Sequence, residues 1–350
     1  MSHKLLIVDD SALMRSHLSR LFTAQGDYEV RIARNGQEAV EENQVFEPDV
    51  ITLDINMPVL DGLGALARIM ATRPVPVVMV SSLTEKGALA TFEALALGAV
   101  DYVAKPDGTI SLSIDTVGRE LLRKVRGALR ARPRLRTASA GAPRGTAPGS
   151  AARSHAPIGA GRGLVLIGVS TGGPGTLEAI LPRLPAGFPQ PIVVAQHMPP
   201  TFTGPFAQRL DGLCALSVQE VAKPCPLEAG HVYVGKGGAD VLIATRGTQR
   251  VVLPRPQSAD HLWHPSVELL GRSALEHVPA SNLVAVMLTG MGSDGADAFA
   301  EIADRGGRTI AESEQSAVVF GMPKELIARN GAQLVLPCER IAAQLIEWLC

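Results

Sequence analysis

The feature that most restricts the fold is the regular alternation of short runs rich in Val, Ile and Leu with longer segments of helical periodicity. Strands that alternate with helices predict parallel sheets with crossover helices, that is, an α/β fold. In the first half of the chain we expect five strands, at 5–8, 29–33, 50–53, 77–80 and 100–103. In the second half the clearest strands are 164–169, 192–195, 232–234, 241–244 and 283–288, with helices at 175–184, 266–277 and 295–305.

Residues 132–162 differ in composition from the rest of the chain. This segment is rich in Pro, Gly, Ala and Ser, and it holds six arginines, no carboxylate and almost no large apolar residue. Such a stretch cannot bury enough apolar surface to offset the entropy of ordering it, so we predict a flexible linker. The linker divides the 350 residues into two expected domains, 1–131 and 163–350. Hydrophobic residues make up 46% of the chain, enough to give each domain a core.

Charge and cysteine content bear on the partners and on the compartment. The formal net charge is −1, so no global excess of positive charge indicates nucleic acid or an anionic membrane as a partner. The four cysteines include no CxxC pair, which is typical of free thiols in a reducing compartment. No signal-peptide pattern follows Met1, and no apolar run reaches the ~18 residues that suggest a membrane span. We therefore expect a soluble, cytoplasmic monomer without membrane insertion or nucleic-acid binding.

Polar side chains end the predicted strands of the first domain. Asp9 and Asp10 follow the first strand, and Asp54 follows the third. Ligands of open parallel sheets bind beyond the carboxyl ends of the strands, so we expect these three carboxylates to converge. Clustered carboxylates repel one another unless a cation lies among them, and a small set of oxygen ligands suits Mg²⁺. Ser81 and Lys105, which end the fourth and fifth strands, could contact a phosphoryl group on one of these carboxylates.

Each of these residues alone could simply cap a strand end at a wet surface, but the joint pattern is more specific. The segments VDDSALMR, LDINMPVLDG, VMVSSLT and DYVAKP resemble a response-regulator receiver domain. The resemblance covers essentially all of residues 1–131. It implies a five-stranded, doubly wound, flavodoxin-like domain that accepts a phosphoryl group from a histidine kinase.

The resemblance also implies a role for each residue that matches the receiver motifs. Asp54 would be the phosphoacceptor. Asp9, Asp10, Asp54 and the backbone carbonyl of Asn56 would hold the Mg²⁺ that phosphorylation needs. Many relatives have an acidic residue where this chain has Asn56, a departure that would change the phosphoryl lifetime rather than remove the site. The switch positions of the family correspond to Ser81, Tyr102 and Lys105.

The strand predicted at 164–169 leads into the Gly-rich sequence GVSTGGPG and then into a helix. Its G-x-S-x-G pattern has small residues around Ser170, which allow a sharp turn that exposes the serine hydroxyl. Helix N-terminal amides beside that hydroxyl would suit an oxyanion. A Gly-rich turn also fits phosphate binding, although neither G-x-G-x-x-G nor the P-loop spacing is present. The turn alone leaves a nucleophile and a plain anion-binding turn both open.

A nucleophilic serine needs a base and an acid that orients the base. His197 follows the strand predicted at 192–195, and Asp294 lies in a Gly-rich loop after the strand at 283–288. Alone, a histidine is more often structural and an aspartate more often caps a helix. Together they predict a catalytic set with Ser170. The order Ser–His–Asp disfavours the α/β-hydrolase fold, whose order is Ser–Asp–His, but it does not argue against the chemistry.

The second half also resembles a known family. The segments LIGVSTGGP, QHMPPTFT, WHPSVELL, MLTGMGSDGA and VVFGMPKE are similar to the catalytic domain of chemotaxis protein-glutamate methylesterase/protein-glutamine glutaminase (CheB), from about residue 164 to 349. The order of receiver, linker and catalytic domain matches that family as well. The resemblance implies a doubly wound, mostly parallel, Rossmann-like domain with Ser170 as nucleophile, His197 as base and Asp294 as orienting acid.

The implied reaction is hydrolysis of glutamyl γ-methyl esters on chemoreceptors, with deamidation of specific glutamines as a second activity. The backbone amides of Thr171 and Met291 would bind the oxyanion, and ester hydrolysis would need no metal. The unphosphorylated receiver would block the catalytic face, and phosphorylation of Asp54 would weaken that contact.

The chain departs from the CheB pattern at positions outside the catalytic set. Relatives often carry Ala-Pro and a later His where this chain has Gly235, Lys236 and Asp240, and they usually have Arg where His264 stands. These departures put the substrate fit in question rather than the chemistry. Two other functions remain open. One is a phosphorylation-controlled binding module whose arginine-rich linker contacts an acidic partner, and the other is a hydrolase of a small ester or amide.

Overall fold

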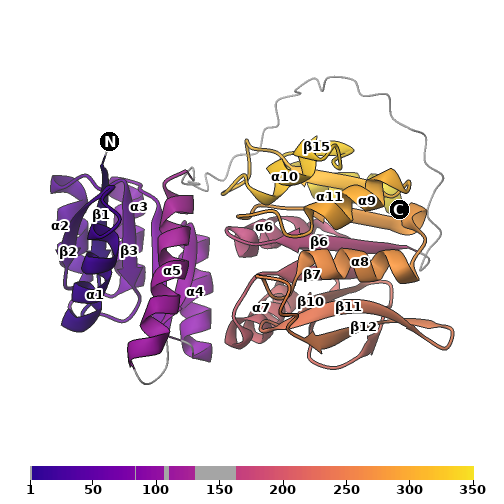
Figure 1. The fold of residues 1–350 in the computed structure, drawn as a ribbon, viewed down its shortest axis with the longest axis horizontal. Helices are drawn as coiled ribbons and strands as arrows, with labels where there is room; N and C mark the ends of the chain where they lie inside the picture. The colour runs from indigo at the N-terminus through magenta and orange to yellow at the C-terminus, as the bar shows by residue number, and fades with distance from the viewer. Residues whose placement is uncertain (1, 83, 106–109, 131–162) are drawn as a thin grey trace.

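The computed structural model describes residues 2–82, 84–105, 110–130 and 163–350. The linker predicted at 132–162 lies outside the described residues. Two α/β units precede and follow it, each built on a mostly parallel sheet (Figure 1). Among the described residues, no helix is both long enough and apolar enough to cross a membrane.

The N-terminal sheet has the strand order β2-β1-β3-β4-β5, and every neighbouring pair is parallel. All five predicted strands are present, with ends displaced by one or two residues. Alternate residues of the inner strands β1, β3 and β4 enter different hydrophobic clusters on the two faces, so these strands are mostly apolar, whereas the edge strand β2 carries Glu29 and Arg31. The strands are β1 (His3–Val8), β2 (Tyr28–Ala33), β3 (Val50–Asp54), β4 (Val77–Ser82) and β5 (Asp101–Lys105).

Helices cover both faces of this sheet. One face packs against α1 (Ala12–Thr23) and α5 (Ile110–Ala128), and the other against α2 (Gly36–Val45), α3 (Gly62–Thr72) and α4 (Glu85–Leu97). The first four helices begin where a short polar side chain accepts a hydrogen bond from an amide of the first turn. These N-caps are Ser11, Asn35, Asp61 and Thr84.

The C-terminal sheet has seven parallel strands in the order β15-β14-β13-β6-β7-β10-β8. From β6 the chain first builds one side of the sheet and then returns to build the other, so the switch point lies between β6 and β13. Ligand crevices form at such switch points. The strands are β6 (Leu164–Val169), β7 (Ile192–Gln196), β8 (Ser217–Val221), β10 (His231–Gly235), β13 (Leu283–Met287), β14 (Arg308–Glu312) and β15 (Leu334–Leu336).

The helices of this unit follow the strands as crossovers. The three predicted helices are present, with shorter bounds. The helices are α6 (Gly173–Ile180), α7 (Pro200–Leu213), α8 (Val267–His277), α9 (Ala296–Asp304), α10 (Met322–Ala328) and α11 (Cys338–Leu349), with 3-10 turns at Leu181–Arg183 and Ala280–Asn282.

The strand predicted at 241–244 exists, but its expected place in the parallel sheet is wrong. It belongs to β11 (Ala239–Arg246), which pairs antiparallel with β12 (Gln249–Pro256) in a separate three-stranded sheet completed by β9 (Cys225–Pro226). Only two residues connect β11 to β12, and Gly247 has a φ of 61°. Such a connection makes a hairpin, because a parallel partner needs a crossover of a dozen or more residues.

The two units contact each other where α4 faces α7 (Figure 1). The ring of Phe92 on α4 lies 6.2 Å from Phe202 and 5.3 Å from Phe206, both on α7. Tyr102 on β5 stacks on Phe202, with the ring centroids 4.8 Å apart and the planes at 15°. All four rings are buried, so one hydrophobic cluster runs from the N-terminal unit into the C-terminal unit.

Candidate functional site

Three carboxylates meet at the carboxyl edge of the N-terminal sheet, as the sequence predicts. Oxygen atoms of Asp9, Asp10 and Asp54 all lie within 4.8 Å of one another. The Nζ of Lys105 lies 2.9 Å from Asp9 Oδ2 and 2.7 Å from Asp54 Oδ2. Burial raises the pKa of Asp54, and the negative charge of Asp9 raises it further. Lys105 lowers this pKa but does not cancel the rise. A small set of hard oxygen donors of this kind is consistent with a Mg²⁺ site.

The other residues predicted for the phosphorylation site lie on β4, on β5 and just after β3. Ser81 is buried, and its hydroxyl donates to the carbonyl of Gly87 at 3.1 Å. Asn56 lies two residues beyond Asp54, and its backbone amide is 3.4 Å from Asp54 Oδ1. Tyr102 is buried at the contact with the C-terminal unit, where burial raises the pKa of its phenol.

A second group of polar residues lies at the switch point of the C-terminal sheet. Ser170 directly follows β6 and His197 directly follows β7, on strands whose last residues, Val169 and Gln196, are paired. The amide of His197 donates to the Val169 carbonyl at 3.1 Å. The side chain of Gln196 donates to the carbonyls of Ser170 and His197, at 3.0 Å each. These bonds fix the serine and the histidine side by side.

His197 and Asp294 form the closest contact in this group, with 2.8 Å between His197 Nε2 and Asp294 Oδ2. The other ring nitrogen, Nδ1, is buried and has no hydrogen-bond partner among the described residues. The expected hydrogen bond between Ser170 and His197 is absent from the described part of the chain. In unliganded sites such bonds are often long, and they tighten only when the substrate is bound.

Asp294 is anchored on the N-terminus of α8. Its Oδ2 accepts a hydrogen bond from the amide of Val267 at 2.7 Å. Its Oδ1 accepts from the Glu268 amide and from the Ser266 hydroxyl, both at 3.0 Å. Burial by itself would raise the pKa of Asp294, but the bonds from His197 and from the helix amides outweigh burial and lower that pKa below its usual 3.8. The acid is therefore held ionised and fixed in orientation.

The amides predicted to bind an oxyanion lie on the loops that follow β6 and β13. Neither the Thr171 nor the Met291 amide donates a hydrogen bond to another described residue. Thr289 joins the two loops, because its carbonyl accepts from Ser170 at 2.9 Å and its hydroxyl donates to the Thr171 carbonyl at 2.8 Å. Gly172 and Gly292 follow the two amides with φ of 77° and 84°, a conformation that favours glycine.

Sequence reasoning missed several side chains that shape this site. Glu312 is fully buried and accepts hydrogen bonds from the Thr289 amide and the Ser316 hydroxyl, at 2.8 Å each. The sequence predicts Ser266 only as the first residue of a helix, whereas in the structure its hydroxyl also donates a hydrogen bond to Asp294. Thr289 and Glu312 are 23 positions apart in the chain and Ser266 and Asp294 are 28 apart, so no local pattern could have indicated these two bonds.

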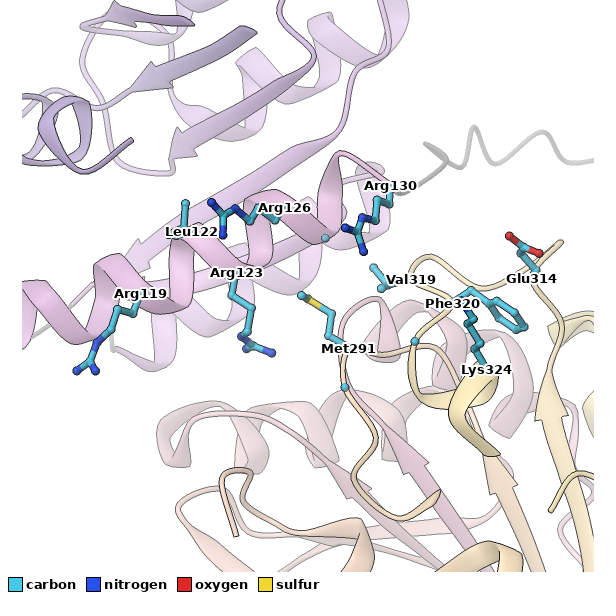
Figure 2. Close-up of a pocket in the computed structure, with 13 residues that line it drawn as sticks. Arg119, Leu122, Arg123, Arg126, Arg130, Met291, Glu314, Val319, Phe320 and Lys324 are labelled. Atoms are coloured by element: carbon cyan, nitrogen blue, oxygen red, sulfur yellow. The ribbon is translucent and has the colours of Figure 1, made fainter. Parts of the chain in front are cut away.

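Aromatic and cationic groups lie between the catalytic histidine candidate and the N-terminal unit. The Trp263 ring stacks on His197, with the centroids 5.5 Å apart and the planes at 19°. The Arg123 guanidinium of α5 lies 4.0 Å from the Trp263 ring centroid. Beside it, α5 and the loops around Met291 and Phe320 enclose a cavity of about 670 Å³ (Figure 2). The N-terminal unit thus lies directly against the loops that form the C-terminal site.

Comparisons with known proteins cover both units. The family described as CheB methylesterase matches residues 165–345, and the response regulator receiver domain matches residues 5–113. Protein-glutamate methylesterase/protein-glutamine glutaminase 3 of Rhodospirillum rubrum is 57% identical over 355 residues, with 99% of this chain and 96% of that protein covered. Protein-glutamate methylesterase/protein-glutamine glutaminase 2 of Rhodopseudomonas palustris is 52% identical, with 99% and 98% covered.

A solved structure supports the fold of the second unit. The crystal structure of the Thermotoga maritima CheB methylesterase catalytic domain is 38% identical in the aligned region, with a TM-score of 0.51. The aligned region covers 53% of this chain and 98% of the Thermotoga maritima chain.

Proposed function

Since this chain belongs to the CheB methylesterase family, we propose that Ser170, His197 and Asp294 perform its hydrolytic reaction and that Asp54 controls it. The chain is a protein-glutamate methylesterase/protein-glutamine glutaminase with a receiver domain, and it acts in chemotaxis adaptation. A kinase is its implied phosphodonor and a chemoreceptor its implied substrate. The observation that carries the residue assignment is the 2.8 Å bond between His197 and Asp294, since His197 follows the strand end that is paired with the one before Ser170.

The proposed reaction is acyl transfer through Ser170. The Ser170 hydroxyl attacks the carbonyl carbon of a glutamyl γ-methyl ester, and His197 Nδ1, the nitrogen that Asp294 leaves free, takes the hydroxyl proton. This step needs a small movement that brings Nδ1 within reach of the hydroxyl. The developing oxyanion accepts hydrogen bonds from the amides of Thr171 and Met291. His197 then protonates the departing methoxide, so methanol leaves and a glutamyl–serine ester remains.

Water completes the cycle. His197 removes a proton from a water molecule that attacks the glutamyl–serine ester, and the products are a free glutamate and the restored Ser170 hydroxyl. A glutamine side chain differs only in its leaving group, so the same steps release ammonia. The serine, the histidine and the two amides supply the nucleophile, the base and the charge stabilisation, and the proposed hydrolysis uses no metal.

The chemistry is tested most simply with a serine-directed probe. A fluorophosphonate should label Ser170 in the folded protein, and tandem mass spectrometry of the digested chain locates the label. Ser293, which is exposed in the loop of Asp294, is the matched control, and Ser293→Ala should leave the labelling unchanged. Labelling of another serine, or equal labelling after Ser170→Ala, would contradict the assignment.

We also propose that Asp9, Asp10, Asp54 and the backbone carbonyl of Asn56 hold Mg²⁺ during phosphorylation of Asp54. The ion would neutralise negative charge between the carboxylates and the phosphodonor. Lys105, which already contacts Asp9 and Asp54, would pair with the added phosphoryl group. The Ser81 hydroxyl would turn from the Gly87 carbonyl to a phosphoryl oxygen, and Tyr102 would follow it.

The aromatic contact between α4 and α7 supports a blocking role for the unphosphorylated receiver. Tyr102 stacks on Phe202 and lies three residues before Lys105, so a change at the phosphorylation site can reach the domain contact within one strand. On the other side of the contact, Arg123 covers Trp263, which covers His197. Phosphorylation would shift the population towards an open arrangement that admits a receptor.

We also propose the domain limits and a cytoplasmic location. The limits 1–131 and 163–350 are supported by the family matches at 5–113 and 165–345, which lie on either side of the predicted linker. A cytoplasmic location is supported by the implied kinase partner and by the absence of a membrane-spanning helix among the described residues.

A further inference from the structure

A second carboxylate–imidazole pair is linked by short contacts to the proposed catalytic set. Asp240 on β11 is 1% exposed, and its Oδ1 lies 2.8 Å from His264 Nδ1. The same oxygen accepts from the Ser266 amide at 2.9 Å, and Oδ2 accepts from the Ser258 amide at 2.9 Å. One buried carboxylate therefore fixes three points of the segment 258–266, which connects β12 to α8.

This segment carries two side chains that contact the proposed catalytic pair. Trp263 stacks on the His197 ring, and Ser266 donates from its hydroxyl to Asp294 Oδ1 at 3.0 Å. Trp263 immediately precedes His264, and the Ser266 amide is itself bound to Asp240. A shift of the Asp240–His264 pair would therefore move the Trp263 ring and the Ser266 hydroxyl together.

We propose that Asp240 and His264 are positioning residues that set the geometry of His197 and Asp294 through Trp263 and Ser266, an inference that rests on the proposed role of that catalytic set. A buried carboxylate is stable only when its charge is paired and hydrogen-bonded, and strong bonds of this kind hold one geometry. Displacements of about 1 Å in a catalytic group can cost about 100-fold in rate, so a rigid support matters for the chemistry.

From the sequence, Asp240 and His264 bear only on substrate fit, whereas in the structure they are direct partners, 2.8 Å apart. The contacts of their segment connect both residues to the proposed catalytic pair.

The substitution Asp240→Asn separates positioning from bulk packing. It keeps the volume of the side chain, removes the negative charge and replaces one acceptor oxygen by an amide that donates. One of the three groups that now bond Asp240 must lose its acceptor. Because the Asp240 side chain is only 1% exposed, a bound substrate cannot reach it directly, and we expect kcat to fall about 10-fold or more while KM stays within about twofold.

The experiment compares Asp240→Asn, His264→Gln and the double variant with the wild type in the full-length protein. Methanol release from methylated receptor membranes gives kcat and KM, and the rate of fluorophosphonate labelling reports the activation of Ser170 without any receptor. The matched control is Asp260→Asn, the same change on an exposed residue of the same loop. Circular dichroism at the assay temperature shows that each variant is folded, and His264→Gln decides the question if Asp240→Asn unfolds.

Each single variant should lower kcat and the labelling rate by similar factors, and the double variant should be no slower than the slower single variant, because the residues act through each other. The control should stay within about twofold of the wild type. Unchanged labelling in a folded Asp240→Asn protein, or a double variant whose loss is the product of the single losses, would overturn the proposal. A wild type that is not labelled at Ser170 would instead refute the proposed function.

Discussion

Replacing Phe92 by Ala should loosen the contact between the receiver and the catalytic domain and raise the activity of the unphosphorylated protein. Phe92 lies on α4 of the receiver and is 1% exposed, with its ring against Phe202 and Phe206 of α7. The change removes two aromatic contacts and leaves every residue of α7 and of the catalytic set in place.

The size of the effect follows from the buried ring. Full burial of a Phe side chain is worth about 1.5–3 kcal/mol, and an aromatic pair adds about 0.5–1.5 kcal/mol. Part of that burial lies within the receiver, so we assign about 2 kcal/mol to the domain contact. Two kcal/mol changes the ratio of closed to open protein about 30-fold. If about 1% of the protein is open before the change, about a quarter is open after it, a rise of about 20-fold in basal activity.

The assay is methanol release from methylated receptor membranes without a phosphodonor. Leu89→Ala is the control, because Leu89 lies on the same helix but is 56% exposed. Adding acetyl phosphate should stimulate Phe92→Ala by a smaller factor than the wild type, since both proteins reach the same open state. A folded Phe92→Ala protein with wild-type basal activity and wild-type stimulation would refute the blocking contact.

Three further outcomes are expected. Asp54→Asn, or removal of Mg²⁺ with EDTA, should abolish stimulation of methanol release by acetyl phosphate while Ser170 labelling persists; stimulation that survives either treatment contradicts the receiver site. Deleting 1–131 should raise basal methanol release, and unchanged or lower release argues against blocking. The lowered pKa of Asp294 adds stability above its usual 3.8 that is lost as pH falls through the folded value. Urea unfolding should therefore show Asp294→Asn less stable than wild type at neutral pH, with the gap closing in acid.

Much of the fold could be predicted from sequence because its signals are local. The inner strands of the receiver sheet are mostly apolar, since helices cover both faces, and the residue that ends each of them is easy to find. Asp9, Asp54 and Lys105 were placed together for that reason, and the structure joins them. The sequence likewise predicts Ser170 and His197 just after strands, and the structure pairs these two strands.

The remainder depends on contacts between residues that are distant in the chain. The strand at 241–244 looked like its neighbours, and only the two-residue connection to β12 decides that it forms a hairpin. The bond from Ser266 to Asp294 and the pair of Asp240 with His264 link residues at least 24 positions apart. No periodicity reports such pairs, so residues that seemed to concern substrate fit became candidates for positioning the catalytic set.

The most direct test of the central claim is methanol release by wild type and Ser170→Ala, each with and without acetyl phosphate, on methylated receptor membranes. Wild type should release methanol slowly and accelerate when acetyl phosphate is added. Ser170→Ala should stay at the enzyme-free level in both conditions, because no other group supplies the nucleophile. Methanol release by folded Ser170→Ala at more than a few per cent of the wild-type rate would contradict the account.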